Sequence, residues 1–467
     1  MKNSKSIFTI LFAVFMGCTS NLQAQKNRKS QRPLVVSMSK PNVVLIVSDD
    51  QGNADAGYQR SPSTVSTPAI DKLAADGVIF TNGYASGYVC APTRAGLLTG
   101  RYQQRFGFYR APDSRIGLPV TEITLADVLK ENGYATGMFG KWHLGLTEKH
   151  NPINRGFDEF YGFLGHGGHD YFDLTIKENP NDKLQPMYRN LDKISDTGYL
   201  TDNLAREATS FIKAKANKEA PFFMYLPFNA VHTPMQAPEA DIKKYNTGNP
   251  KRAILLAMLY RMDLAIGNVI ETLKEEGVYD NTIIIFFSDN GGATASTSDN
   301  SPLNGAKHTV YEGGFRVPFI VSWPDKLNPA VNDEPVISID VMPTICAALD
   351  IELPKGVIYD GKNILSAISG DLKEPLHKQL FFDGNDGSWA VREGDWKLLY
   401  NKKKSLELYN LKEDYIEQHN VLEQYSYKVN DLQEKYTTWR SEMGKPMEGD
   451  PKKKRKKKKK TKSEKKI

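Results

Sequence analysis

Cysteine is scarce in this chain of 467 residues, which contains only three. One of them, Cys18, lies close to the N-terminus, so Cys90 and Cys346 are the only pair left for a disulfide bond. A dense disulfide framework, of the kind that holds small secreted domains together, is therefore excluded. Cys346 lies in an apolar, helix-like stretch and is expected in the core. A Cys90–Cys346 disulfide remains the structural alternative to a chemically active Cys90.

Long apolar runs are also missing after the N-terminal segment, and no later stretch predicts a membrane span. At the N-terminus, Lys2 and Lys5 precede the short apolar run Ile7–Met16, which is typical of an export signal. A cleaved signal peptide over 1–24 is one interpretation, and a lipoprotein signal that ends before a lipid-modified Cys18 is the other. Both predict an exported protein, located in the periplasm or at the cell surface, or secreted. The lipid on Cys18 would attach it to a membrane.

Positive charge is concentrated at one end of the chain. Residues 451–467 contain twelve lysines and arginines and one acidic residue, a net charge of +11. Because the whole chain has a net charge of +6, the remainder carries −5. We interpret 450–467 as a disordered, solvated tail, and its functional alternative is binding of polyanions such as sulfated polysaccharide or an anionic cell surface. No nucleic-acid partner is expected for an exported protein.

Three apolar segments read as strands buried on both faces, and each ends in polar side chains. The first ends in Asp49 and Asp50, the second in His232, and the third in Asp289 and Asn290. In sheets covered by helices, ligands collect outside the carboxyl ends of the strands. The oxygen-only set of Asp49, Asp50, Asp289 and Asn290 favours Ca²⁺, with Mg²⁺ as the alternative, over zinc. Each pair taken alone is also compatible with an ordinary turn or helix cap.

Strands and helices alternate from residue 41 to about 350, which predicts an α/β sheet of many strands, at least partly parallel. The pattern includes a long helix from about Ile254 to Glu276 and a strand over Phe315–Trp323. Near Pro375 it changes to short strands, followed by a polar helix over roughly Tyr427 to Met443. We therefore expect a large mixed sheet between helices and a smaller antiparallel sheet with one helix.

The segment Cys90-Ala-Pro-Thr-Arg-Ala-Gly-Leu-Leu-Thr-Gly100 has the strongest local signal. Pro92 favours the start of a helix, whose free N–H groups would point back toward Cys90 and favour negative charge there. Arg94 adds a permanent cation, and Leu97 and Leu98 would anchor the helix in the core. This segment resembles the signature of the type I sulfatases, in which Cys-x-Pro-x-Arg directs oxidation of the cysteine to formylglycine (3-oxoalanine). A second segment, Gly133–Gly145, resembles the second signature of that family.

The resemblance extends from about residue 41 to 445 and implies an alkaline-phosphatase-like fold. It implies a bound Ca²⁺ held by Asp49, Asp50, Asp289, Asn290 and the modified Cys90. By the same resemblance, Arg94, Lys141 and His143 hold and activate the formylglycine, and His232 and Lys307 face the sulfate ester. Thr93 departs from the commonest form of the signature, which has serine, but it occupies the variable position. The partners implied are a sulfated glycan and the formylglycine-generating or radical enzyme that matures Cys90.

The chemistry that the resemblance implies is attack on sulfur by hydrated formylglycine, whose two hydroxyls allow sulfate to be expelled again. A sugar alkoxide leaves poorly, so an acid must protonate it, and His232 is the candidate. Lys141, Lys307 and Arg94 would stabilise the charge on the sulfonyl oxygens, and His143 would take the final proton. His166 and His169 lie in a glycine-rich loop and are further candidates for substrate contact. His150, His377 and His419 are expected at the surface.

The expected function is therefore hydrolysis of sulfate esters in a sulfated polysaccharide or oligosaccharide, algal (ulvan or carrageenan) or glycosaminoglycan. The alternatives are a phosphatase or phosphodiesterase of the alkaline phosphatase superfamily and a non-catalytic glycan-binding relative. Related phosphatases use Ser or Thr with two metals and histidine ligands, whereas this chain has Cys90 and one oxygen-only site. The segments we expect are a signal over 1–24, a flexible tether over 25–40, a catalytic domain over 41–374, an α+β subdomain over 375–449 and the tail over 450–467.

Overall fold

The computed structural model describes residues 40–59, 65–165, 167–176, 186–384, 386–401 and 406–447. The predicted export signal with Cys18, most of the tether, His166 and the polybasic tail lie outside the described residues. The described residues belong to one compact unit of the chain.

In the described part of the chain, ten strands form one mixed sheet in the order β11-β2-β10-β9-β1-β8-β4-β5-β6-β7. The five central strands, β9-β1-β8-β4-β5, are parallel. Strand β10 is antiparallel to β9, β6 is antiparallel to β5, and β7 is antiparallel to β6. The strands of this sheet are β1 (Asn42–Ser48), β2 (Val78–Phe80), β4 (Ala135–Lys141), β5 (Glu159–Phe163), β6 (Met187–Arg189), β7 (Asp192–Ile194), β8 (Phe222–Pro227), β9 (Thr282–Ser288), β10 (Phe319–Ser322) and β11 (Ala330–Asn332). A separate short pair consists of β3 (Gly83–Tyr84) and β12 (Val336–Ile337).

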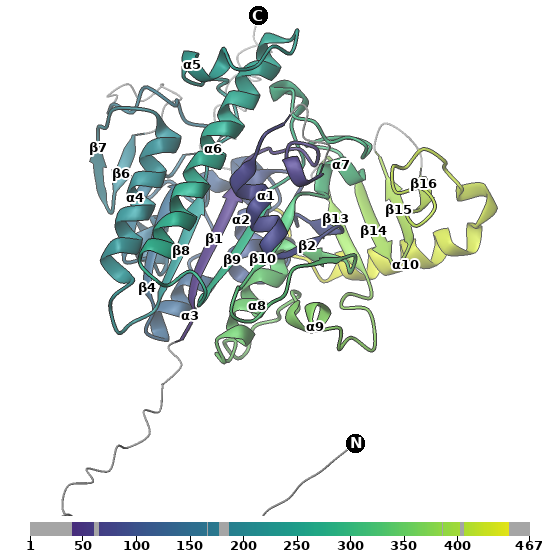
Figure 1. The fold of residues 1–467 in the computed structure, drawn as a ribbon. Coiled ribbons are helices and arrows are strands. Elements are labelled where there is room, and N and C mark those ends of the chain that lie inside the picture. Colours follow the sequence, from purple (N-terminus) through teal and green to yellow (C-terminus); the bar gives the residue numbers. More distant parts are fainter. Residues whose placement is uncertain are drawn as a thin grey trace, which may run out of the picture. The chain divides into compact units, whose positions relative to one another are not determined.

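Both faces of the central strands are covered, as their unbroken apolar sequences predict. Every residue of β1 is buried, and its side chains alternate between two cores: Val44 and Ile46 lie in one, Val43 and Leu45 in the other. Helices α1, α4 and α6 pack over the first face, and α2, α3 and α8 over the second (Figure 1).

The α-helices differ in length from one turn to seven turns. They are α1 (Pro68–Asp76), α2 (Cys90–Thr99), α3 (Leu125–Glu131), α4 (Leu200–Lys215), α5 (Glu239–Ile242), α6 (Pro250–Glu275), α7 (Glu312–Phe315), α8 (Val341–Ala348), α9 (Leu365–Ile368) and α10 (Ser426–Ser441). Short 3₁₀ turns occupy Gly57–Gln59, Gln103–Phe106, Ala111–Arg115, Glu148–His150, Pro152–Arg155, Thr294–Ser296, Ser338–Asp340 and Leu422–Gln424.

Helix α6 is the one described helix that is both long and apolar enough to span a membrane. Its most apolar stretch is 67% buried inside the protein, where it packs between α4 and α1. It begins with Pro250, whose position matches its preference for the first helical turn, and Asn249 accepts backbone N–H groups as the N-cap. Burial in the fold accounts for the apolar sequence of α6.

A smaller antiparallel sheet follows, formed by β13 (Leu380–Asp383), β14 (Trp389–Glu393), β15 (Trp396–Tyr400) and β16 (Leu406–Asn410). Helix α10 packs on it, and the ring of Trp389 stacks on Tyr436 with centroids 4.1 Å apart. The other side of this sheet shares a core with Tyr84 and Phe315 of the larger part. The expected fold class, a large mixed sheet between helices and a small antiparallel sheet with a helix, is confirmed.

Local details differ from the sequence prediction in three places. The segment predicted as one strand over 315–323 is the end of α7 followed by the shorter β10, because Gly313 and Gly314 allow a helical turn packed closely against the backbone. His150 is buried beside Gly117 and Gly145 instead of lying at the surface. His377 is 6% exposed and its Nε2 lies 2.9 Å from Asp340, so this prediction of a surface residue is also wrong.

Candidate active site

Three neighbouring strands end at the same edge of the large sheet, as their sequences predicted. Strands β1 and β9 are parallel with Ser48 opposite Ser288, so Asp49 and Asp50 emerge beside Asp289 and Asn290. On the other side of β1, the chain that follows β8 continues to His232 and is held there by two backbone hydrogen bonds between Asp49 and residues 230 and 231. The topology thus brings the predicted ligand set together.

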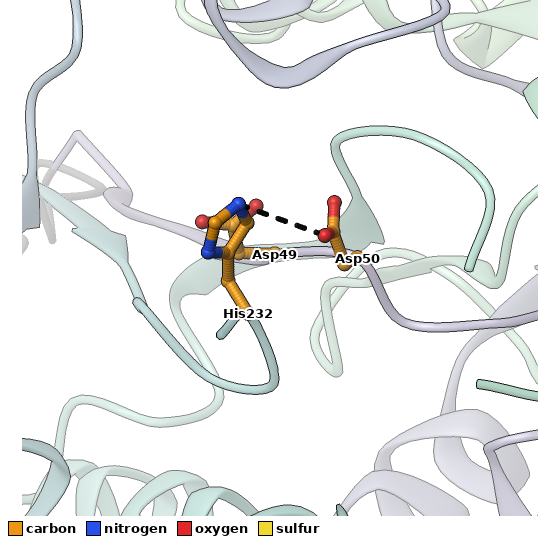
Figure 2. Close-up of side chains that lie close together, drawn as sticks. All are labelled: Asp49, Asp50 and His232. Atoms are coloured by element: carbon orange, nitrogen blue, oxygen red, sulfur yellow. Dashed lines mark ion pairs between the residues drawn. The ribbon is translucent and has the colours of Figure 1, made fainter. Parts of the chain in front are cut away.

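The oxygen and sulfur atoms of this edge are close enough to share one ion. Ligand atoms of Asp49, Cys90 and Asp289 lie within 4.8 Å of one another, and so do those of Asp49, Asp50 and His232. Figure 2 shows His232 turned toward the two aspartates of the β1 end, with its Nε2 3.7 Å from Asp50 Oδ2. Asp50 has a left-handed backbone, φ 63°, which is uncommon for a residue other than glycine.

Two buried oxygen atoms in this group accept no hydrogen bond within the described part of the chain: Oδ1 of Asp49 and Oδ1 of Asn290. A buried carboxylate or amide oxygen without a partner costs free energy, so it marks a place where another ligand belongs. Both atoms come from the set predicted to bind a cation. Hard oxygen donors of this kind fit Ca²⁺ or Mg²⁺.

Each of the three carboxylates has a different cationic side chain as its nearest ionic partner. Lys141 Nζ lies 2.5 Å from Asp49 Oδ2, Lys307 Nζ 2.5 Å from Asp50 Oδ1, and Arg94 Nη2 2.7 Å from Asp289 Oδ2. Three negative and three positive formal charges therefore balance before any ion binds. A divalent cation would give the group a net positive charge, which suits an anionic substrate.

The pKa values in this group follow from burial and these pairs. Burial raises the pKa of Asp50, but the ammonium of Lys307 and the imidazole of His232 outweigh it and hold that pKa well below its usual range. For Asp289, burial and the neighbouring Asp49 outweigh Arg94 and raise the pKa to about 6. Burial also raises the pKa of the Cys90 thiol above its usual value. A thiol in this environment is a poor nucleophile, because the thiolate is the reactive form.

Cys90 is the first residue of α2, two residues earlier than the start predicted from Pro92. The turn before it is held by Thr93, whose hydroxyl accepts the Gly87 N–H at 3.1 Å and lies 3.1 Å from the Gly87 carbonyl. A Cβ on Gly87 would crowd Thr93, so the chain needs glycine here. Serine at position 93 would offer the same hydroxyl, which explains why threonine is compatible with the motif.

Neither cysteine of the described chain forms a disulfide: Cys90 and Cys346 are both free and buried. Cys346 lies on α8 and packs in the hydrophobic core, as expected, whereas Cys90 lies next to the carboxylates of Asp49 and Asp289. The disulfide alternative is therefore ruled out in this structure. Leu97 and Leu98 are fully buried and anchor α2.

Arg94 and Lys141 are both fully buried, and a hydrogen bond joins the Arg94 side chain to the Lys141 backbone. The Arg94 guanidinium donates to Asp289 and, at 2.9 Å, to the backbone carbonyl of Lys141. Arg94 therefore holds a predicted metal ligand and the end of β4. Its pKa lies above its usual range because the neighbouring Asp289 carboxylate outweighs the effect of burial.

His232 and His143 are held in the site by different hydrogen bonds. Nδ1 of His232 lies 2.7 Å from the Thr233 carbonyl, and because a carbonyl only accepts, Nδ1 carries a proton and Nε2 faces the carboxylates. Burial lowers the pKa of His232, although its side chain is still 15% exposed to solvent. His143 is buried two residues beyond β4, with φ 61°, and its Nε2 accepts the Gly167 N–H at 3.4 Å.

His169 is 1% exposed, and Nδ1 lies 2.7 Å from the Asp170 carbonyl. Its ring packs on Phe163, with centroids 5.1 Å apart. These contacts hold the loop after β5. Contact of His169 with substrate stays a prediction. His166 lies outside the described residues.

Lys307 lies in the loop between β9 and α7 and is 8% exposed. His308 beside it is exposed, and its ring meets Tyr88, two residues before Cys90, with centroids 6.0 Å apart. His308 directly follows a predicted substrate ligand, and this position in the sequence was its only signal. Tyr88 carried no such signal, and a helix start next to it was the only indication.

Comparisons with known proteins agree with this arrangement. The family model described as "Sulfatase" matches residues 41–351, and that described as "N-sulphoglucosamine sulphohydrolase, C-terminal" matches 306–442. Arylsulfatase J of Mus musculus is 35% identical over 411 residues, covering 84% of this chain and 68% of the relative. N-acetylgalactosamine-6-O-sulfatase of Bacteroides thetaiotaomicron is 30% identical over 525 residues, covering 93% of this chain and 98% of the relative.

Among solved structures, Ps i-CgsB in complex with k-i-k-neocarrahexaose superposes with a TM-score of 0.82 and 36% identity, covering 87% of this chain and 94% of the other. The phosphonate monoester hydrolase of Agrobacterium radiobacter shares the fold at a TM-score of 0.65 and 20% identity, covering 86% and 95%. The alkaline-phosphatase-like fold class is thus confirmed. With its matched domains, relatives and arrangement of residues, this chain belongs to the sulfatase family and is a sulfuric ester hydrolase.

Proposed function

We propose that this protein is an exported sulfatase that hydrolyses sulfate esters of a sulfated polysaccharide or oligosaccharide, using Cys90 after its conversion to formylglycine. One observation carries the proposal: Cys90 begins a helix against paired carboxylates and cations, in a place where its own thiol would be unreactive. Hydrated formylglycine supplies two hydroxyls on one carbon, one for attack on sulfur and one for release of sulfate.

The proposed metal ligands are Asp49, Asp50, Asp289 and Asn290, together with the modified Cys90. The two unpartnered oxygens of Asp49 and Asn290 support this set. All the protein donors are hard oxygens, so we propose one Ca²⁺ ion, with Mg²⁺ as the alternative. When bound, the cation supplies positive charge that favours an ionised hydroxyl at position 90 and an anionic substrate.

Lys141 and Lys307 are proposed to hold the sulfate group. Each ammonium is already fixed by an aspartate, Lys141 by Asp49 and Lys307 by Asp50, so neither has to be ordered when substrate binds. Pre-positioned cations of this kind stabilise charge that develops on the sulfonyl oxygens. Arg94 has its donors on Asp289 and on the Lys141 carbonyl, and we assign it the role of holding these two groups.

Proton transfers are assigned to the two remaining histidines of the site. Nε2 of His232 faces the carboxylates on the partly exposed side, where a leaving sugar oxygen would lie, so His232 is the proposed general acid. His143 is the proposed acceptor of the proton that is lost when sulfate departs. His166 and His169 stay candidates for substrate contact by sequence position only.

A carbohydrate substrate is supported by the relatives. One is named an N-acetylgalactosamine-6-O-sulfatase, and one structure holds a neocarrahexaose, each matching most of this chain. The predicted N-terminal export signal fits a protein that meets such substrates outside the cytoplasm, in the periplasm, at the cell surface through a lipid on Cys18, or in the medium. A formylglycine-generating or radical enzyme of the host is the maturation partner.

The decisive experiment measures sulfate release from a panel of ulvan, carrageenan and glycosaminoglycan oligosaccharides, with mass analysis of the peptide that contains Cys90. We expect sulfate release from at least one glycan and a peptide mass that corresponds to formylglycine. Cys90→Ala should abolish release, whereas Cys346→Ala, which changes the other buried cysteine, should not. Active enzyme with an entirely unmodified thiol would contradict the mechanism. Release of phosphate from phosphate esters without sulfate release would favour the phosphatase alternative.

A further inference from the structure

A buried ionic cluster lies outside the site described so far. Lys397 of β15 places its ammonium 2.8 Å from the Glu312 carboxylate of α7 and 2.8 Å from the Glu417 carboxylate. The side chains are 1% exposed for Lys397 and 0% for both glutamates. We call these three residues the Lys397 cluster.

The Lys397 cluster is hard to explain by its contribution to the free energy of unfolding, because burying charged groups has a high desolvation cost. Two carboxylates share the Lys397 ammonium away from water, and the Arg316 guanidinium lies 3.6 Å from Glu312 as a second cation. Replacing buried ion pairs with apolar residues is often neutral or stabilising. Burial and then the neighbouring Glu312 push the pKa of Glu417 upward against the effect of Lys397. Glu417 also has a left-handed backbone, φ 57°. Buried charges and a strained backbone are typical of places where the surrounding structure fixes a geometry that the protein needs for function.

The cluster fixes both ends of the loop that carries Lys307. At the far end, the Glu417 carboxylate accepts the backbone N–H of Glu312 at 2.7 Å. At the near end, the Glu417 carbonyl accepts the side-chain N–H of Asn304 at 3.4 Å. The Gly313 N–H donates to the Asn304 carbonyl at 2.7 Å and closes the base of the loop.

Between these ends, the loop makes few other fixed backbone contacts with its surroundings. The Lys307 N–H donates to the Gly292 carbonyl at 3.1 Å and the His308 N–H to the Tyr88 carbonyl at 3.2 Å. Gly305 and His308 both have positive φ, 81° and 72°, so the loop follows an unusual path. A loop of this kind needs its ends held to keep the Lys307 ammonium against Asp50.

We infer that Glu417 is a positioning residue for Lys307, holding the 304–312 loop so that the ammonium meets the sulfate group. The inference rests on the proposed function, because it takes Lys307 as a sulfate ligand. It assigns to the C-terminal sheet a part in binding the anion, through Lys397, although the sheet contributes none of the proposed ligands.

The test is a double-mutant cycle with Glu417→Gln and Lys307→Ala in the mature enzyme, read by competitive inhibition with inorganic sulfate and by kcat and KM for a sulfate ester. If Glu417 acts through Lys307, Glu417→Gln weakens sulfate inhibition by about tenfold. The double variant should then bind sulfate as weakly as Lys307→Ala alone. Once the Lys307 ammonium is absent, Glu417→Gln can no longer displace it. Glu413→Gln, an exposed change in the same segment, should behave as wild type.

Thermal unfolding of each variant, with and without sulfate, separates this effect from general loosening. An additive cycle, or sulfate inhibition unchanged by Glu417→Gln, would overturn the inference. No effect of Lys307→Ala would instead count against the proposed role of Lys307. If Glu417→Gln fails to fold, Asn304→Ala removes the tie at the other end of the loop, and the same non-additivity with Lys307→Ala is required of it.

Discussion

At the scale of single residues, the site is built from carboxylates that are each held by a buried cationic side chain. Lys141 takes one oxygen of Asp49, and Oδ1 of the same group accepts nothing among the described residues. Arg94 takes Oδ2 of Asp289. The cationic partners thus orient the carboxylates, and they leave one buried oxygen of Asp49 without a partner among the residues that the structure describes, where a cation would bind.

Substitution of Asp289 should reduce both turnover and the free energy of unfolding. Asp289→Asn replaces a charged proposed metal ligand with a neutral one and takes from the buried Arg94 the carboxylate of its shortest ion pair, so we expect turnover to disappear. Stripping one partner from a buried ion pair also lowers the free energy of unfolding by about 3–5 kcal/mol. Activity assays and thermal unfolding with and without added Ca²⁺ measure both effects.

Asp280 offers a matched control, since it is exposed at the opposite end of β9. Asp280→Asn should retain activity, and its unfolding should respond to Ca²⁺ as the wild type does. A Ca²⁺-dependent rise in melting temperature that survives in Asp289→Asn would count against Asp289 as a metal ligand.

His232 should matter in proportion to how poorly the alcohol leaves. In His232→Ala we expect hydrolysis of sugar sulfates to fall by about 100-fold or more, as for loss of a general acid. Aryl sulfates, whose phenolate needs no proton, should lose far less. Parallel kcat/KM measurements on a sulfated sugar and an aryl sulfate check this, and equal losses would remove His232 from the role.

At the scale of elements, the turn into α2 decides where residue 90 lies. The Thr93 hydroxyl is bonded inside a buried turn, so Thr93→Val leaves the Gly87 N–H without that acceptor. We expect a loss of roughly 1–3 kcal/mol in the free energy of unfolding. Thr93→Ser keeps the hydroxyl and serves as the control. Denaturant unfolding gives both values, and equal destabilisation by the two changes would show that the methyl group matters instead.

The elements also show what the sequence could predict. Strand ends such as Asp49 and Asp289 were predictable, because an apolar run followed by carboxylates is a local pattern. The start of α2 was two residues off, since Pro92 also fits the first turn of a helix that begins before it.

Partners far apart in the chain carry no such pattern. Lys397 reads as one polar position on a short strand, and nothing nearby indicates that Glu312 and Glu417 will enclose it. His377 was misjudged for the same reason, because Asp340 is its partner only in the folded chain. Burial of charged groups depends on topology, which local periodicity does not specify.

At the scale of the whole molecule, the charge of the chain divides at residue 450. Without the tail the protein has a net charge of −5, so the tail is the part that would attract a polyanion. Truncation after Asp450 should reduce salt-dependent retention on immobilised sulfated polysaccharide and leave hydrolysis of a small aryl sulfate unchanged. Retention of the truncated protein equal to that of the full chain would eliminate this role for the tail.

The balance of three carboxylates and three cations at the sheet edge also bears on the order of events in making the enzyme. Since the charges cancel in pairs, we expect the polypeptide to reach its native state before an ion binds, unlike domains that fold only around their metal. Binding of the proposed cation would then be a late, reversible step that follows folding.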